Sequence, residues 1–380
     1  MSDWQQTMAG AIESVEGRYD RLKRRLGHSL GRQHRPIIVP YRSYGSGDRL
    51  LVRGRVLDDK QISTGLAEDS IWQNVLSTYR RLESDEIAGA RVEARFRGLT
   101  AEAVSDDEGY FKLWLEGGEG PALSGWAEVD LRLCALPAGE TESADAVAEV
   151  LVPSEHAQFG VISDIDDTVM RSYATELIRV VKLTFLGNAS TRLPFPGVAA
   201  FYRALHRGPD ATNPLFYVSS SPWNLYDLLV DFFRLQEIPA GPMFLRDWGI
   251  TREELLPTDH SRHKLEAIER LFEFYGELPF ILIGDSGQQD PEIYAEIVRR
   301  HPRRVLAVYV RDVSAASSRT EAVMTLAKEV TGAGSTLILA KDTLVMAEHA
   351  VQKGWIEAST IGDIAHEIAM DKGDGDEPVI

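Results

Sequence analysis

The stretch Phe159-Gly-Val-Ile-Ser-Asp-Ile-Asp-Asp-Thr168 decides the fold, because an apolar run ends in it at an acidic turn. Residues 159–163 predict a buried strand, and the carboxylates of Asp164 and Asp166 follow at once. Two carboxylates two positions apart can divide a phosphoryl transfer between them. One attacks phosphorus, and the other protonates the leaving oxygen and then activates water.

Two later apolar runs also end in polar residues. Residues 214–218 lead into Ser219-Ser-Ser-Pro-Trp223, and residues 280–283 lead into Gly284-Asp285, with Asp290 five positions further on. Between these runs, Lys264 lies in a segment with a helical pattern. In an open parallel α/β sheet, ligands bind outside the carboxyl ends of the strands. We therefore expect these polar residues to meet in one crevice.

The residue types suit a phosphate ester. Carboxylates alone would repel phosphate, and a Mg²⁺ ion held by Asp164 and Asp285 removes that repulsion. Lys264 can neutralise Asp164 and the phosphoryl oxygens. The hydroxyls of Ser219 and Thr168 can donate hydrogen bonds to phosphate oxygens.

The ordered set resembles the four motifs of the haloacid dehalogenase superfamily of phosphatases: Asp164-x-Asp166-x-Thr168, Ser219, Lys264 and Gly284-Asp285-x4-Asp290. The resemblance implies that Asp164 is the nucleophile and that Asp166 is the acid/base, with its backbone carbonyl on the metal. It implies Asp285 as a metal ligand and Asp290 as a ligand or as a residue that positions one. Phosphate is then expected to be bound by Lys264 and by the hydroxyls of Ser219, Ser220 and Thr168.

A closer resemblance is to the catalytic domain of the actin-patch-associated phosphatidate phosphatase family. It rests on Asp-Ile-Asp-Asp-Thr168, Tyr217-Val-Ser-Ser-Ser-Pro-Trp223, His263-Lys264 and Gly284-Asp285-Ser-Gly-Gln-x-Asp290, and it covers about residues 150–350. It implies a Mg²⁺-dependent enzyme that releases phosphate from phosphatidate. Two alternatives stay open: the same chemistry on a soluble phosphomonoester, and a scaffold that binds phosphate without turnover.

Taken singly, each of these residues has a simpler interpretation. Aspartates favour turns and helix caps, a serine at a strand end often satisfies the backbone, and a lysine on a helix is usually solvated. Trp223 and His263 are expected to pack rather than to react, and Asp167 to organise the turn. Only the ordered set favours chemistry.

Composition limits the class of protein. The chain has 380 residues, 44% hydrophobic and 26% charged, with a net charge of -17. This acidity argues against nucleic acid as a partner and against adsorption of the whole surface to anionic membranes. The first residues lack the apolar core of a signal peptide, and no apolar run is long enough for a membrane span. We expect a cytoplasmic protein whose one cysteine, Cys134, is buried and inert.

The chain divides into four expected parts. Residues 1–35 form a basic amphipathic helix, which either packs on the next domain or contacts an anionic membrane peripherally. Residues 36–150 form an all-β sandwich that is open to binding a partner protein, with strands at 36–41, 50–56, 90–96, 110–115 and 127–133. Residues 151–355 form the α/β, HAD-like parallel-sheet domain, and residues 356–380 a helix and an acidic tail.

Three shorter segments complete the expectations. Residues 64–87 are expected to be a helical insertion, and residues 137–147 a linker or exposed loop. Residues 169–213 are expected to include a small cap over the site, which would leave room for a bulky substrate.

Overall fold

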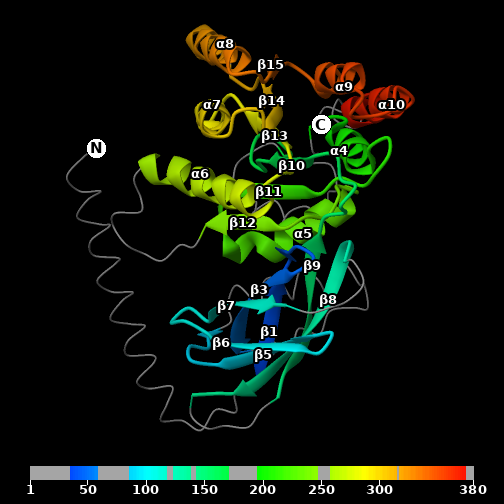
Figure 1. The fold of residues 1–380 in the computed structure, drawn as a ribbon. Helices are drawn as coiled ribbons and strands as arrows, with labels where there is room; N and C mark the ends of the chain where they lie inside the picture. Colours follow the sequence, from blue (N-terminus) through cyan, green and yellow to red (C-terminus); the bar gives the residue numbers. More distant parts are fainter. Residues whose placement is uncertain are drawn as a thin grey trace, which may run out of the picture.

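The protein is an α/β chain with one parallel sheet and two other sheets (Figure 1). The computed structural model describes residues 35–58, 85–117, 123–137, 143–170, 195–246, 257–314 and 316–373. The predicted N-terminal helix, residues 64–84 of the predicted helical insertion, most of the predicted cap and the tail beyond residue 373 lie outside these ranges. No described helix is both long enough and apolar enough to span a membrane.

The parallel sheet has six strands in the order β12-β11-β10-β13-β14-β15. Their bounds are β10 Gly160–Ser163, β11 Leu215–Pro222, β12 Met243–Arg246, β13 Phe280–Asp285, β14 Val305–Arg311 and β15 Leu337–Ala340. Neighbouring strands pair in parallel throughout. Every residue of β10 and β13 is buried, because helices cover both faces of the sheet.

The helices form a layer on each side of this sheet (Figure 1). One layer contains α6 Pro257–Phe274, α7 Asp290–Arg300 and α8 Ser317–Gly332. The other contains α4 Val198–Arg207, α5 Tyr226–Leu235, α9 Thr343–Gln352 and α10 Thr360–Gly373, and a short 3₁₀ helix, η1 Trp223–Leu225, precedes α5. Successive residues of β10 point to opposite layers, since Val161 belongs to the core cluster with α4 and Ile162 to the one with α6.

The described residues from 35 to 152, which we call the β region, form the two other sheets. One contains β1 Pro36–Tyr41, β3 Arg49–Asp58, β4 Asp85–Glu86 and β7 Tyr110–Glu116. The other runs β2-β9-β8-β5-β6, with β2 Ser43–Tyr44, β9 Asp145–Val152, β8 Gly125–Ala135, β5 Arg91–Phe96 and β6 Leu99–Val104. The pairings are antiparallel except between β2 and β9. Both sheets contribute to one hydrophobic cluster.

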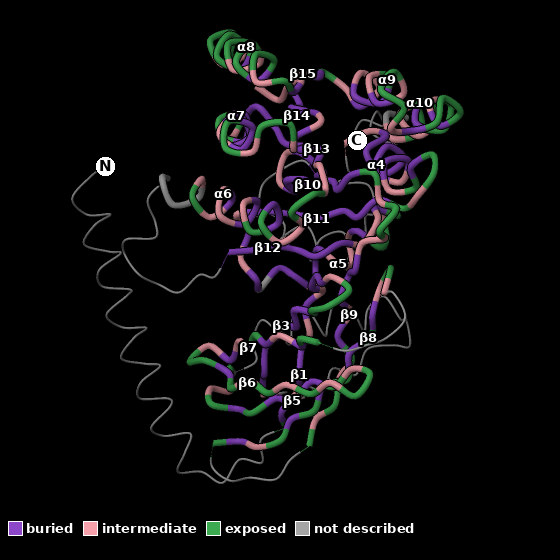
Figure 2. The backbone as a smooth tube through the Cα atoms, viewed as in Figure 1, coloured by how far each residue is buried: buried purple, intermediate pink, exposed green. Residues whose placement is uncertain are grey.

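The β region packs directly on the described residues 159–373, which we call the α/β region. Strand β3 is almost wholly buried (Figure 2), because Val52 faces the cluster between the two antiparallel sheets whereas Leu51 packs in a core cluster of the α/β region. The ring of Tyr41 stacks on Trp223 with centroids 4.5 Å apart. The backbone N–H of Arg42 donates to the Tyr226 hydroxyl at 2.7 Å. The β region therefore supplies part of the core of the α/β region.

The predicted strands and helices of the described ranges are confirmed, but four details were wrong. Cys134 is exposed, because it lies on the polar face of β8. Residues 145–147 begin β9 instead of ending a linker, and residues 85–86 form β4 instead of a helix. The acidic tail was expected to begin at Asp371, but Asp371 belongs to α10 and accepts a hydrogen bond from the Gly197 N–H at 2.9 Å.

Candidate functional site

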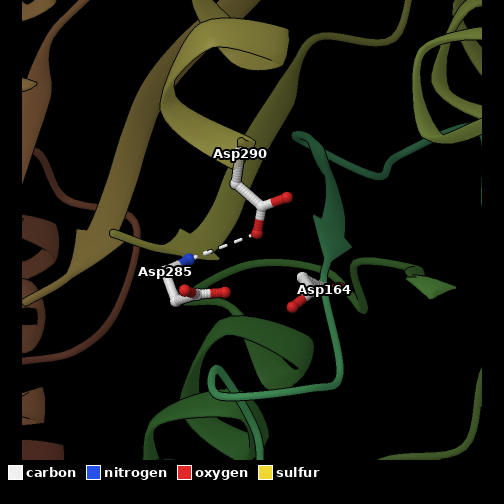
Figure 3. A group of neighbouring side chains, drawn as sticks. All are labelled: Asp164, Asp285 and Asp290. Carbon is white, nitrogen blue, oxygen red and sulfur yellow. Dashed lines mark hydrogen bonds between the residues drawn. The ribbon is translucent and has the colours of Figure 1, made fainter. Parts of the chain in front are cut away.

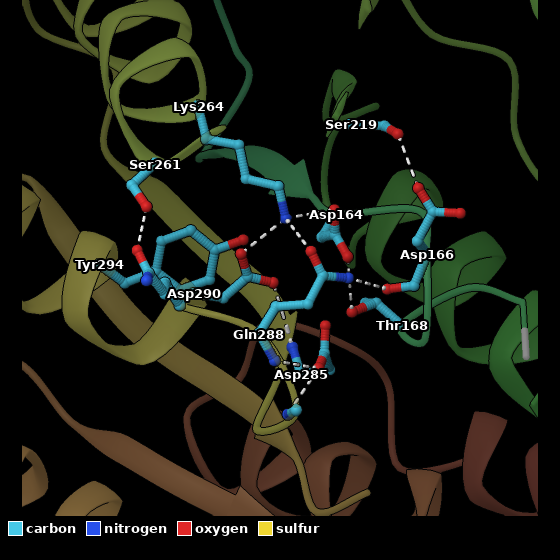
Figure 4. Close-up of polar contacts among 12 residues, drawn as sticks. Asp164, Asp166, Thr168, Ser219, Ser261, Lys264, Asp285, Gln288, Asp290 and Tyr294 are labelled. Atoms are coloured by element: carbon cyan, nitrogen blue, oxygen red, sulfur yellow. Dashed lines mark hydrogen bonds and ion pairs between the residues drawn. The ribbon is translucent and has the colours of Figure 1, made fainter. Parts of the chain in front are cut away.

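The parallel sheet brings the polar residues of the quoted motifs to one edge. Asp164 follows β10, Ser219 lies in the last part of β11, and Asp285 ends β13. The first residue of α7 is Asp290, and Lys264 extends from α6 (Figure 4). Because parallel strands end at a common edge, these side chains converge although the set spans more than 120 residues of the chain, from Asp164 to Asp290.

The turn after β10 depends on Asp167. Its φ is 57°, in the left-handed region that aspartate tolerates better than most residues. Its N–H donates to the Met170 carbonyl at 2.7 Å, and the Val169 N–H donates to the Ile165 carbonyl at 2.9 Å. Asp167 thus helps to shape the turn, as predicted, and the turn carries Asp164 and Asp166.

Three buried carboxylates lie together at this edge (Figure 3). One ligand oxygen each from Asp164, Asp285 and Asp290 falls within 4.8 Å of the others, and all three residues are at most 1% exposed. Lys264 is buried beside them, with its Nζ 2.7 Å from Asp164 Oδ1 and 2.7 Å from Asp290 Oδ1. One ammonium thus faces three carboxylates among the described residues of this cluster.

The protonation of this cluster follows from its burial. Burial and, second to it, the neighbouring Asp290 together raise the pKa of Asp285 to about 7. Burial also raises the pKa of Asp164 well above its ordinary value, although Lys264 opposes this. For Lys264, burial lowers the pKa, but Asp164 and Asp290 outweigh burial and the pKa rises, so the ammonium stays charged.

Asp285 has an orphan oxygen that fits a metal ion. Its Oδ1 accepts hydrogen bonds from the backbone N–H groups of Gly287 at 2.6 Å and Gln288 at 2.9 Å. Its Oδ2 is buried and has no hydrogen-bond partner among the described residues. A buried charged oxygen without a partner is costly. The three carboxylates could therefore hold a metal ion, which would supply the missing partner and the missing positive charge.

Asp166 is held away from this cluster by two serines. Its Oδ2 accepts hydrogen bonds from the hydroxyls of Ser219 at 2.8 Å and Ser221 at 3.0 Å. The Ser219 Oγ in turn accepts the Ser221 N–H at 2.9 Å. Ser220, between them, is partly exposed. On the other side, Thr168 donates to Asp164 Oδ2 at 3.3 Å.

Sequence reasoning missed two residues of this site. Ser221 was quoted in the serine run but given no role. Gln288 lies between Asp285 and Asp290, where its amide donates to the Asp166 carbonyl oxygen and its Oε1 accepts from Lys264, both at 3.3 Å. The signal was weak in both cases, because a third serine and a loop glutamine carry no distinctive spacing.

Comparison with known proteins identifies part of the chain. Residues 159–312 match the family model described as the catalytic domain of phosphatidate phosphatase APP1. The yeast Saccharomyces cerevisiae phosphatidate phosphatase APP1 is 30% identical over 298 residues, which are 73% of this chain and 48% of the yeast protein. Residues 159–312 form an APP1-like catalytic domain. All the candidate catalytic, phosphate-binding and metal-binding residues lie within this APP1-like domain.

Other relatives add less. An uncharacterized protein of Schizosaccharomyces pombe is 32% identical over 157 residues, which are 40% of this chain and 25% of that protein. The chain therefore spans less than half the length of the two curated relatives. Among solved structures, a carbohydrate acetylesterase from Xanthomonas citri matches with a TM-score of 0.24 and 11% identity, over 72% of this chain and 68% of that one. A TM-score this low carries no argument about fold or function.

Proposed function

We propose that this chain is a Mg²⁺-dependent phosphatase that works through an aspartyl-phosphate, with phosphatidate or a related lipid phosphate as its lead substrate. The observation that carries the proposal is the convergence of Asp164, Asp166, Lys264 and Asp285 at one edge of the sheet. The match to a catalytic domain that is named for phosphatidate phosphatase supports both the chemistry and the substrate.

Asp164 is the proposed nucleophile. Its Oδ1 is paired with Lys264 and its Oδ2 accepts from Thr168, so the carboxylate is fixed at the end of β10. Attack by one of its oxygens on phosphorus forms the aspartyl-phosphate and breaks the bond to the leaving oxygen. Lys264, Ser219, Ser220 and Thr168 are proposed to bind the phosphate oxygens, and Ser219 would then turn its hydroxyl from Asp166 to the phosphate.

Asp166 is the proposed acid/base. It gives a proton to the leaving alcohol and later takes one from the water that hydrolyses the aspartyl-phosphate. The hydroxyls of Ser219 and Ser221 and the amide of Gln288 hold this residue in place. Ser221 and Gln288 are therefore proposed as positioning residues.

The proposed cofactor is Mg²⁺, held by Asp164, Asp285, Asp290 and the Asp166 backbone carbonyl. Such a carboxylate-rich set suits a hard divalent cation. When bound, the ion supplies positive charge against the carboxylates and the substrate phosphate. The orphan Oδ2 of Asp285 supports this assignment.

We also propose the finer fold assignments. The α/β region is a HAD-like domain within residues 151–355, supported by the parallel sheet with motif residues at its carboxyl edge. Residues 36–150 are a β-sandwich domain, supported by the cluster that both of its sheets share. The basic segment 1–35 is proposed to contact lipid surfaces peripherally. If so, its deletion would reduce hydrolysis on vesicles more than hydrolysis of a soluble ester.

The deciding experiment measures phosphate release with Mg²⁺ from phosphatidate in mixed micelles and from a panel of soluble phosphomonoesters. Wild type is compared with Asp164→Asn and with the exposed control Asp145→Asn. We expect release from phosphatidate that is lost only in Asp164→Asn, while circular dichroism shows both variants folded. Release from soluble esters alone would remove the lipid assignment, and no release from any substrate would favour a phosphate-binding scaffold.

A further inference from the structure

A cavity lies where the β region meets the α/β region, and no catalytic assignment uses it. Its volume is about 320 Å³. Residues of β3, η1, β12 and α6 line it, so both regions contribute (Figure 1). Junctions between packed regions are common places for ligand sites, and this volume is at the lower end of the range for small-molecule pockets.

The lining of this cavity, which we call the arginine pocket, is rich in positive charge. It includes Arg53, Arg246, Arg262 and Arg270, against the single carboxylate of Glu266 among the described lining residues. Glu266 is 2.8 Å from Arg262 and 3.7 Å from Arg270, so it is shared by two of the four. Four guanidinium groups around one small cavity stand out in a chain whose net charge is -17.

The inner wall of the arginine pocket is rigidly held. The guanidinium of Arg53 lies 5.2 Å from the ring centroids of both Trp223 and Phe244, and it donates to the Met243 carbonyl at 3.2 Å. Arg246 is only 8% exposed at the end of β12. Guanidinium groups fixed in this way lose little conformational freedom when they bind an oxyanion.

His263 is a further polar residue of this lining. It lines the arginine pocket, and its Nε2 is buried without a hydrogen-bond partner among the described residues. Buried polar atoms in folded proteins nearly always have a partner. Burial lowers the pKa of the His263 imidazole, and the Phe244 backbone, which opposes this, is a candidate partner within the protein.

The arginine pocket is separate from the cluster of Asp164, Asp285 and Asp290, which we call the aspartate cluster, but the same elements of the fold contribute to both. Helix α6 directs Lys264 into the aspartate cluster, whereas Arg262, His263 and Glu266 of the same helix line the pocket. The end of β11 also serves both sites. Ser221 donates a hydrogen bond to Asp166. Trp223, two residues further along the chain, lines the pocket. Carboxylates dominate the aspartate cluster and arginines the described lining of the pocket, so of these two sites the pocket is the one expected to take an anion when no metal is present.

We propose that the arginine pocket binds a phosphate group, in addition to the phosphate that is hydrolysed at the aspartate cluster. One arginine can donate two hydrogen bonds to two oxygens of the same phosphate. Four arginines in one small cavity therefore suit a phosphate ligand better than they suit a carboxylate or a neutral ligand. The volume admits a free phosphate ion or the headgroup of an anionic phospholipid and excludes its acyl chains. Both sources share this chemistry.

The test measures binding of inorganic phosphate to the full chain freed of divalent metal and of chelator, at constant ionic strength, by calorimetry. Without metal, the aspartate cluster repels phosphate, so binding reports on the arginine pocket. Arg270→Gln is compared with Arg299→Gln. Both arginine side chains are 54% exposed and both pair with a glutamate of their own helix, but only Arg270 lines the pocket. Because both are exposed, neither variant endangers the fold.

We expect Arg270→Gln to weaken phosphate binding about tenfold and Arg299→Gln to leave it unchanged. A second arm measures sedimentation with phosphatidylcholine vesicles that contain or lack phosphatidate, again without metal. Weaker recruitment of Arg270→Gln than of Arg299→Gln to the phosphatidate vesicles identifies the headgroup as ligand, whereas an effect on inorganic phosphate alone identifies the free ion. If neither arm distinguishes the two variants, the proposal is overturned. No turnover is measured, so this result is independent of the proposed phosphatase activity.

Discussion

The substitution Asp285→Asn should stabilise the metal-free protein while it damages the metal site. The side chain of Asp285 is fully buried, and its Oδ1 accepts two backbone N–H groups that an asparagine oxygen can accept equally well. The new amide nitrogen replaces Oδ2, which has no hydrogen-bond partner among the described residues. The substitution therefore removes a buried negative charge and keeps the shape and both hydrogen bonds.

The magnitude follows from the pKa of Asp285, which is raised from 3.8 to about 7 by burial and by Asp290. Because the folded-state pKa is above the unfolded one, the side chain costs no stability well below pH 4 and progressively more as the pH rises to about 7. A shift of about three units corresponds to about 4 kcal/mol when the group is fully ionised. At pH 5, below this raised pKa, the same linkage gives less than half of that amount.

The assay is urea denaturation of wild type and Asp285→Asn without metal, at pH 5 and at pH 8. We expect the free energy of unfolding of the variant to exceed that of wild type by an amount that grows between these pH values to about 4 kcal/mol. With Mg²⁺ present this difference should shrink, because wild type gains more free energy from metal binding than a variant that has lost one carboxylate ligand. Asp145→Asn, at an exposed position, should change little at either pH.

Two results would refute this reasoning. If the variant is less stable than wild type at pH 8 without metal, the ionised carboxylate of Asp285 does not destabilise the folded protein. An equal gain at both pH values would mean that the benefit comes from packing or hydrogen bonding and not from ionisation.

Three further predictions concern other contacts. Lys264→Met should lower the free energy of unfolding without metal by about 3–5 kcal/mol, because it leaves buried carboxylates uncompensated, and a loss that Mg²⁺ does not reduce would contradict this. Tyr41→Ala removes the ring stacked on Trp223 and should cost about 3 kcal/mol in urea denaturation, whereas a loss below about 1 kcal/mol would show that this contact does not secure the β region. Ser221→Ala should lower kcat for phosphate release about tenfold with little change in KM, because Asp166 loses one of two hydroxyl donors; unchanged kcat would argue against a positioning role.

The strands that position the candidate site could be predicted because each is a short apolar run that ends in a polar residue. Strands β10 and β13 are covered on both faces, so their sequences are apolar without alternation. Parallel strands end at one edge, and this constraint brought Asp164 and Asp285 together, whereas Lys264 reaches them from helix α6. The catalytic and metal-binding roles of these residues stay predictions.

Other features depend on contacts that no local pattern carries. The hydrogen bonds of Ser221 and Gln288 depend on the conformation of the turns, which spacing does not reveal. The docking of the β region depends on the second face of β3, whose near-continuous apolar sequence looks the same whatever covers it. Cys134 is different, because it lies two and four residues after Arg132 and Asp130 and therefore on the same polar face of β8. The prediction that Cys134 is buried ignored this alternation of polar and apolar residues.

The hydrogen bond from Arg53 to the Met243 carbonyl has a consequence for self-association. Met243 lies in β12, one of the two edge strands of the parallel sheet, and edge strands offer peptide groups to which another chain can add. Arg53 occupies one of these groups and, with the β region, covers this strand. An α/β region produced without residues 35–152 should therefore self-associate in a concentration-dependent way. A relative that lacked the β region would need another feature that prevents strand addition at this edge, such as a proline, a lysine or a covering helix.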